Sequence, residues 1–268
     1  MVIKENIMKN IIYISLFLIS GGVFADKLNT SLGDTNPFLS EQVQQRNIKI
    51  EPKGLVSYSF AENKNQINSM VTSSDYLNET QSTSTYGYVE VDSSSISDFS
   101  SIERGYKDFK AELSRRSAVD ILAKSNKGKV DEYAVHRSDM PSDEFSEEFS
   151  MPSGTYIPDK GWDTSTRIIK STKFGSMVIT EWDFTLSDGG VLMDSDAVNQ
   201  KVNGNPAILV IRQDKYNENR GETILAWADE KKSYSIQLFK NIKREGNVEN
   251  LVNFAGNLHT TFSTSDEY

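Results

Sequence analysis

The chain contains no cysteine, and this absence excludes several functions at once. No disulfide framework can form, no thiol can act as a nucleophile, and no cysteine is available for the acylation that anchors a bacterial lipoprotein. Histidine is scarce, since His136 and His259 are the only two and lie far apart in the sequence. Zinc sites need Cys, His and carboxylate ligands at short spacing. We therefore predict no metal site.

The sequence motifs of common enzyme classes are also missing. The chain has no Gly-x-Ser-x-Gly nucleophile elbow, no His-Glu-x-x-His pair, and neither glycine-rich pattern that binds nucleotide phosphates. We accordingly predict no catalytic residue and no cofactor. A site assembled in space from two carboxylates, or from Ser and His, remains open. The sequence favours a non-enzymatic protein without deciding the question.

Long apolar runs are absent except near the beginning of the chain. Lys9 precedes the apolar run 11–19, and small residues at Val23 and Ala25 fit a signal-peptidase site. The run is shorter than the ~20 residues that a membrane span needs. We predict a signal peptide over residues 1–25, cleaved after Ala25, with a buried N-terminal helix as the alternative. The protein is then periplasmic or secreted, without a membrane span.

Basic residues are outnumbered by acidic ones, and the formal net charge is −9. A surface of this sign repels phosphates, so a nucleic-acid partner is not expected. Hydrophobic residues make up 37% of the chain, as in soluble globular proteins. We expect a polar extension over residues 26–50 and one α+β domain over 51–268, best defined over 155–268.

Alternating apolar residues predict several β-strands. Residues 54–60 alternate, and in 177–186 one face carries Trp182 while Glu181 lies on the other, as in an antiparallel strand with one face in water. The stretch 221–238 has an apolar run, a charged break and an alternating run, and it predicts a hairpin.

Two stretches have the spacing of amphipathic helices. Ser100 and Glu103 form a capping box at the start of the first helix. The second helix is predicted over 247–262, with Asn247 as its cap. A helix with one apolar stripe and a sheet with one apolar face can cover each other. The predicted fold is therefore α+β, an antiparallel sheet with helices on one face and helix 247–262 covering that sheet.

Residues 140–154 hold an acidic segment between two Met-Pro-Ser triplets. This composition favours a solvated linker or a short surface helix, since the oxygen ligands and glycine of a calcium loop are missing. Two residues are candidate contacts for a ligand or partner. Trp162 lies in a predicted loop, and His136 ends a possible short strand.

The order of elements at the C-terminal end resembles a known class of extracytoplasmic domain. The stretches "NGNPAILVI", "TILAWADEKKSYSI" and "NVENLVNFAGNL" resemble the strand, hairpin and helix of periplasmic lipoprotein-carrier and sigma-regulator domains, including the anti-sigma C-terminal type. That resemblance implies a curved antiparallel sheet whose concave face holds a lipid chain or a protein segment. The stretch "YIPDKGW" is similar to photosystem-accessory (PsbP-like) domains, which is the second resemblance.

These observations favour an exported, soluble, non-enzymatic binding or interaction module of the bacterial cell envelope. Its expected partner is an unidentified protein or a small apolar ligand. Two alternatives remain open: a periplasmic or secreted hydrolase, and an accessory protein of an envelope or secretion assembly.

Overall fold

The computed structural model describes the part of the chain that carries the sheet and its helices. The described residues are 49–50, 55–58, 74–115, 133–140, 144–158, 160–186, 191–229 and 231–258. The predicted signal peptide lies outside them, as does His259. None of the described helices is long and apolar enough to cross a membrane.

The described elements are mixed helices and strands. The strands are β1 Lys49–Ile50, β2 Leu55–Tyr58, β3 Val89–Val91, β4 Phe145–Ile157, β5 Gly161–Ser171, β6 Gly175–Asp183, β7 Val191–Asp194, β8 Gln200–Val202, β9 Asn205–Asp214, β10 Gly221–Ala228 and β11 Lys232–Leu238. The helices are α4 Ser74–Tyr86, α5 Phe99–Arg115 and α7 Val248–Gly256, with single 3₁₀ turns at Ser93–Ser95 and Ser195–Ala197.

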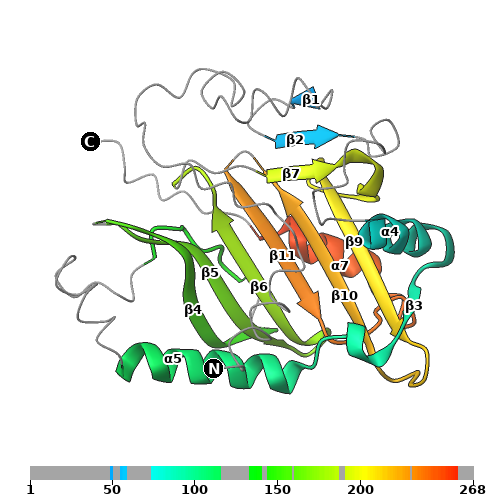
Figure 1. Cartoon of the computed structure of the whole chain (residues 1–268), viewed down its shortest axis with the longest axis horizontal. Coiled ribbons are helices and arrows are strands. Elements are labelled where there is room, and N and C mark those ends of the chain that lie inside the picture. Colours follow the sequence, from blue (N-terminus) through cyan, green and yellow to red (C-terminus); the bar gives the residue numbers. More distant parts are fainter. Residues whose placement is uncertain are drawn as a thin grey trace.

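Most strands belong to one sheet of eight, in the order β3-β9-β10-β11-β6-β5-β4, with β8 also paired to β9 (Figure 1). All of its pairs are antiparallel except β3 with β9. The strands β1, β2 and β7 form a smaller sheet. The fold class is thus α+β with a mostly antiparallel sheet, and the predicted hairpin 221–238 is the pair β10–β11.

Helices pack on both faces of the large sheet. Ile169 of β5 is buried in one cluster with Leu251 of α7. The preceding residue, Ile168, is buried in another cluster with Tyr106 of α5. Successive strand residues point to opposite faces, so α7 and α5 lie on opposite sides, and α7 is behind the sheet in Figure 1. The prediction of helices on one face is wrong, because the central strands are apolar on both sides.

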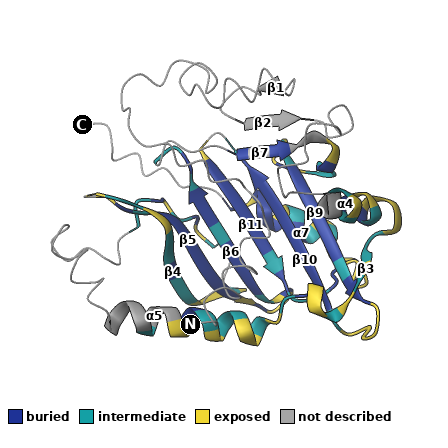
Figure 2. Ribbon diagram, viewed as in Figure 1, coloured by how far each residue is buried: buried dark blue, intermediate teal, exposed yellow. Residues whose placement is uncertain are grey.

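The central strands are buried along almost their whole length (Figure 2). Every residue of β10 is buried, and so are Ala207 to Ile211 of β9. On the α7 face, Leu225 and Ile236 are fully buried beside Leu251 and Phe254 of the helix. Burial of both faces explains the continuous apolar runs that these two strands show in the sequence.

The C-terminal helix is shorter than predicted. It ends at Gly256, with Asn257 as its C-cap, and residues 259–262 of the predicted helix lie outside the described part. Asn247 stands at the N-cap but its side chain makes no capping bond to a backbone N–H of the first turn. Its side chain instead contacts Glu245 and accepts a hydrogen bond from Asn250.

Helix α5 begins one residue before the predicted capping box. The Asp98 carboxylate accepts hydrogen bonds from the backbone N–H and the hydroxyl of Ser101, at 3.1 and 2.8 Å. The bond from the Ser101 hydroxyl contributes most to lowering the pKa of Asp98, and the bonds from the Ser101 and Ser100 amides add to it. Asp98 is therefore the cap, and Ser100 lies inside the helix.

Strand β4 corrects the prediction of a linker or short surface helix in 140–154. It pairs with β5 and forms one edge of the sheet, with register shifts between Glu147 and Phe149 and between Ser153 and Tyr156. Gly154, at φ +80°, lies in the second irregularity, where a Cβ would come within 2.1 Å of the Asp163 carboxylate. Two of the acidic residues that suggested a solvated segment, Glu147 and Glu148, are exposed residues of this edge strand.

Candidate functional site: a buried charge cluster beneath residues 133–140

The segment 133–140 crosses the α7 face of the sheet near the edge formed by β4 and β5. The Trp162 carbonyl oxygen at the start of β5 accepts hydrogen bonds from the backbone N–H groups of Ala134 and Val135, at 2.8 and 3.0 Å. Val135 and Ser138 are buried, whereas His136 is exposed. The segment is thus anchored at its beginning by backbone bonds and further along by the side chains beneath it.

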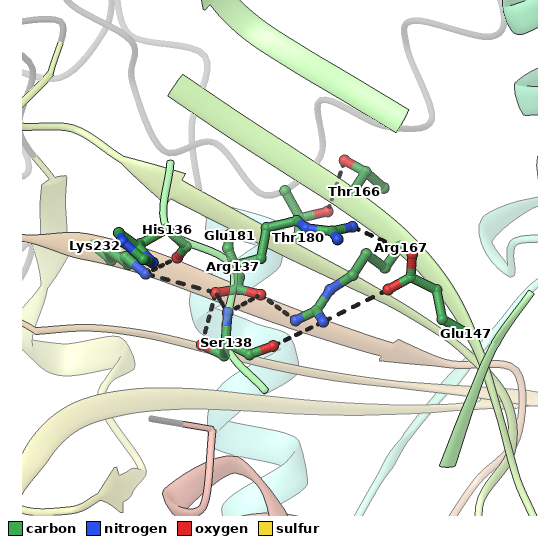
Figure 3. A network of polar contacts seen from close by, with 9 residues as sticks. All are labelled: His136, Arg137, Ser138, Glu147, Thr166, Arg167, Thr180, Glu181 and Lys232. Carbon is green, nitrogen blue, oxygen red and sulfur yellow. Dashed lines mark hydrogen bonds and ion pairs between the residues drawn. The ribbon is translucent and has the colours of Figure 1, made fainter. Parts of the chain in front are cut away.

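Glu181 of β6 is the centre of these contacts (Figure 3). Its side chain is fully buried, and it accepts hydrogen bonds from the Ser138 backbone N–H at 2.9 Å and from the Ser138 hydroxyl at 2.7 Å. The Arg167 guanidinium donates to its other oxygen. The sequence predicted that this face of β6 is in water, and the burial of Glu181 corrects that prediction.

Arg167 of β5 lies opposite Ile179 in the β5–β6 register, two pairs away from Glu181 and therefore on the same face, and only 3% of it is exposed. Its Nη1 donates to the Ser138 carbonyl oxygen at 2.8 Å and is 3.8 Å from a carboxylate oxygen of Glu147. Its Nη2 donates to Glu181. The Nε atom is buried and has no hydrogen-bond partner in the described structure. A buried N–H donor without an acceptor carries a desolvation cost of about 1–3 kcal/mol.

Lys232, the first residue of β11, supplies the second buried cation. Its ammonium group donates to the His136 carbonyl oxygen and lies 3.8 Å from the Glu181 carboxylate. Burial lowers the pKa of Lys232, and the nearby charges of Glu181, Asp183 and Asp229 oppose that effect only in part. Two buried cations, Arg167 and Lys232, therefore share the fully buried carboxylate of Glu181. Glu147, 3.8 Å from Arg167, supplies a second negative charge that balances them.

The rim of the cluster is formed by Arg137 and Glu147. The Arg137 guanidinium donates to Glu147 Oε1 at 3.2 Å, and both side chains are about one third exposed. The same guanidinium lies over the Tyr133 ring, 4.9 Å from its centroid, a cation–π distance. Glu147 thus joins two arginines, with one carboxylate oxygen toward Arg137 and the other toward Arg167.

These side chains border a hollow of about 420 Å³. Its lining consists of residues 133–140 together with Glu147 and Arg167. The volume lies in the range of small-molecule sites. Arg167, buried and charged, is the part of the lining that belongs to the sheet core, and the segment 133–140 and Glu147 of the edge strand provide the rest.

Of the two contact residues predicted from the sequence, His136 lines this hollow and Trp162 does not. The bond that ties His136 to the cluster comes from its backbone carbonyl. Trp162 is half buried in β5, its ring stands edge-on to Tyr156 at 5.5 Å, and its carbonyl anchors the segment. It is a strand residue and not a loop residue.

Sequence reasoning missed the residues that form the cluster. The alternating pattern of 177–186 places Glu181 on the solvent side of its strand, and the composition of 140–154 places Glu147 in a linker or short surface helix. No pattern in the sequence analysis marks Arg167. One signal was present in the sequence. Arg167 stands next to the apolar pair Ile168-Ile169 in β5, and a charge inside such a strand needs a buried partner.

A second buried ion cluster lies on the opposite face of the sheet. Arg212 of β9 contacts Glu79 of α4 at 2.8 Å and Glu222 of β10 at 2.7 Å. Glu222 is fully buried and also accepts a hydrogen bond from Gln237 at 2.6 Å. This cluster fastens α4 to the sheet, and its donors and acceptors are matched.

Metal binding finds no support in the part of the chain that is described, where no three potential ligand residues come together. The arrangement around Arg167 is suited to binding charged or polar groups. Comparisons with models of protein families, with curated proteins and with solved structures find no match to this chain.

Proposed function

We propose that this protein is an exported, non-enzymatic binding module of the bacterial cell envelope, and that the hollow beneath residues 133–140 is its binding site. The observation that carries the proposal is the unpaired Nε of Arg167, a buried donor in the wall of a hollow of ligand size. A ligand acceptor reaching that atom would remove a desolvation cost that the protein bears by itself.

The proposed ligand is polar, in contrast to the apolar ligand expected from the sequence. Arg137, Asp139 and Glu147 line the hollow, and an apolar molecule would strip water from these charges without replacing it. The apolar part of the same sheet face has another role in the proposal. There Leu251 and Phe254 of α7 belong to one buried cluster with strand residues, which argues against a lipid chain bound between the helix and these strands.

The chemistry of the cluster supports binding over hydrolysis. Ser138 is buried, and its hydroxyl donates to the Glu181 carboxylate. His136 contributes its carbonyl oxygen to Lys232. The Ser138 hydroxyl is thus used to hold the segment in place.

The test is native mass spectrometry of the mature protein, purified gently from its own envelope. Wild type is expected to carry a small polar adduct that Arg137→Gln loses. Arg244→Gln is the matched control, because Arg244 is a similarly exposed arginine paired with Glu218 at 3.9 Å outside the cluster. Absence of an adduct from wild type, or its equal retention by Arg137→Gln, would contradict the proposed site.

Export is tested separately by cell fractionation. The proposal expects the protein in the soluble envelope fraction or the medium, beginning at Asp26. Recovery from the cytoplasm with residues 1–25 intact would contradict it.

A further inference from the structure

The charges that line the hollow are balanced. Arg137 and Arg167 are positive, whereas Asp139 and Glu147 are negative. Beneath them, the buried cation Lys232 is matched by the buried carboxylate Glu181. A ligand with a net charge would leave an uncompensated charge in this partly desolvated space, which is costly. A ligand with no net charge keeps the balance.

The carboxylate of Glu147 occupies the position in which a ligand carboxylate would bind. It gives one oxygen to Arg137 at 3.2 Å and directs the other to Arg167 at 3.8 Å, a distance beyond a hydrogen bond. Guanidinium groups bind carboxylates best through two parallel N–H donors. Neither arginine has that arrangement with Glu147, and the Nε of Arg167 has no acceptor at all.

We propose that the ligand is a zwitterion, a free amino acid or short peptide, whose carboxylate takes the place of the Glu147 carboxylate between Arg137 and Arg167 while Glu147 accepts its ammonium group. The inference rests on the proposed function of the hollow and specifies its ligand. The exchange preserves the charge balance, because the ligand brings one negative and one positive group.

The position of Glu147 allows this exchange. Its side chain is one third exposed on the edge strand β4, directly before a register shift. An exposed carboxylate with one hydrogen bond to Arg137 is held weakly, since such pairs contribute about 0–1 kcal/mol. Glu181, in contrast, is fully buried with several donors and stays in place.

The experiment is calorimetric titration of the mature protein with the dipeptide alanyl-alanine. N-acetyl-alanyl-alanine removes the ammonium group, and alanyl-alanine amide removes the carboxylate. The free dipeptide is expected to bind at least about tenfold more tightly than either blocked form, because each blocked form loses a charge-assisted contact. Arg137→Gln should weaken its binding by about tenfold, and Arg244→Gln should leave it unchanged.

Two further probes, glucose and glutarate, separate this inference from the proposed function. Binding of glucose or glutarate that depends on Arg137, without binding of alanyl-alanine, overturns the zwitterion and leaves the binding site standing. Equal affinity for the free and blocked dipeptides also overturns it. The envelope adduct described above judges the binding site independently of these probes.

Discussion

Two neighbouring regions of the α7 face are buried by different means. In the first, strand residues such as Leu225 and Ile236 pack against α7 in a continuous apolar core. In the second, Arg167, Glu181 and Lys232 are buried beneath residues 133–140 by ionic contacts. Both regions belong to the same sheet and share β11, which contributes Ile236 to one and Lys232 to the other.

The apolar region stabilises the fold, whereas the ionic region also determines the position of residues 133–140. Apolar burial is non-directional and contributes in proportion to area, so α7 needs only an apolar face of the right size. A buried carboxylate must meet donors at defined places, because an unmatched charge is costly. The ionic region therefore fixes where residues 133–140 lie, and this in turn gives the hollow its lining.

The largest effect is expected from breaking the apolar region. Trp227 is 4% exposed and its ring is stacked on Tyr234, with centroids 4.9 Å apart. Trp227→Ala should lower the free energy of unfolding by about 3–5 kcal/mol through lost contacts and a cavity. Denaturant unfolding measures this, with the half-buried Trp162→Ala as the milder control. A fully stable Trp227→Ala would contradict the assignment of this ring to the core.

The ionic region is broken by Glu181→Gln, which removes the charge and keeps the shape. Loss of charged hydrogen bonds to Arg167 and Ser138 should cost about 2–3 kcal/mol. The same change should also raise hydrogen exchange at the amides of residues 133–140, because the Ser138 N–H loses its carboxylate acceptor.

Glu222→Gln is the matched control for that variant. Glu222 is also fully buried and paired with an arginine, but it lies on the opposite face and contacts no residue of 133–140 by hydrogen bond or ion pair among those described. It should lose similar stability while exchange in 133–140 stays slow. Equal exchange in both variants would show that Glu181 does not position the segment.

The pH dependence of the unfolding free energy, compared between wild type and Lys232→Met, tests the burial of the Lys232 charge. Burial lowers the pKa of Lys232 from its usual 10.5, so between the lowered value and 10.5 the unfolded chain binds more protons. Stability attributable to Lys232 then rises with pH in that window and levels off above it. The difference in unfolding free energy between wild type and Lys232→Met should rise accordingly. Lys201→Met, at an exposed position, is the control, and a falling difference would contradict the burial effect.

The smallest effect on stability is expected at the rim. Arg137→Gln removes a partly exposed ion pair with Glu147 and should change the free energy of unfolding by about 0–1 kcal/mol. Thermal unfolding measures it against Arg244→Gln. A loss of several kcal/mol would mean that Arg137 belongs to the buried cluster and not to its rim.

Sequence reasoning was successful where burial is apolar and periodic. The hairpin β10–β11, the strand β6 and the helix near the C-terminus all follow from the spacing of apolar side chains, and Trp182 is buried on the apolar face of its strand. These features depend on residues close in sequence, and the hydrophobic pattern records them directly.

The ionic region could not be predicted in the same way. The alternation of apolar and polar residues in β6 predicts that Glu181 faces solvent. No local pattern indicates that residues 133–140 cover it. The strand β4 was missed because its exposed glutamates and Pro152 are typical of loops, although they are also typical of a sheet edge. Both errors come from contacts made between distant parts of the chain.

The long sequence separation within the ionic region has a consequence for the order of folding. The bond from Lys232 to the His136 carbonyl joins residues 96 positions apart, and Glu181 lies between them in the chain. Closing such loops costs entropy before any contact repays it. Residues 133–140 can therefore dock only after β5, β6 and β11 have paired. They should be the last described part to fold and the first to open, so the hollow can open to admit the proposed ligand without disturbing the core beneath α7.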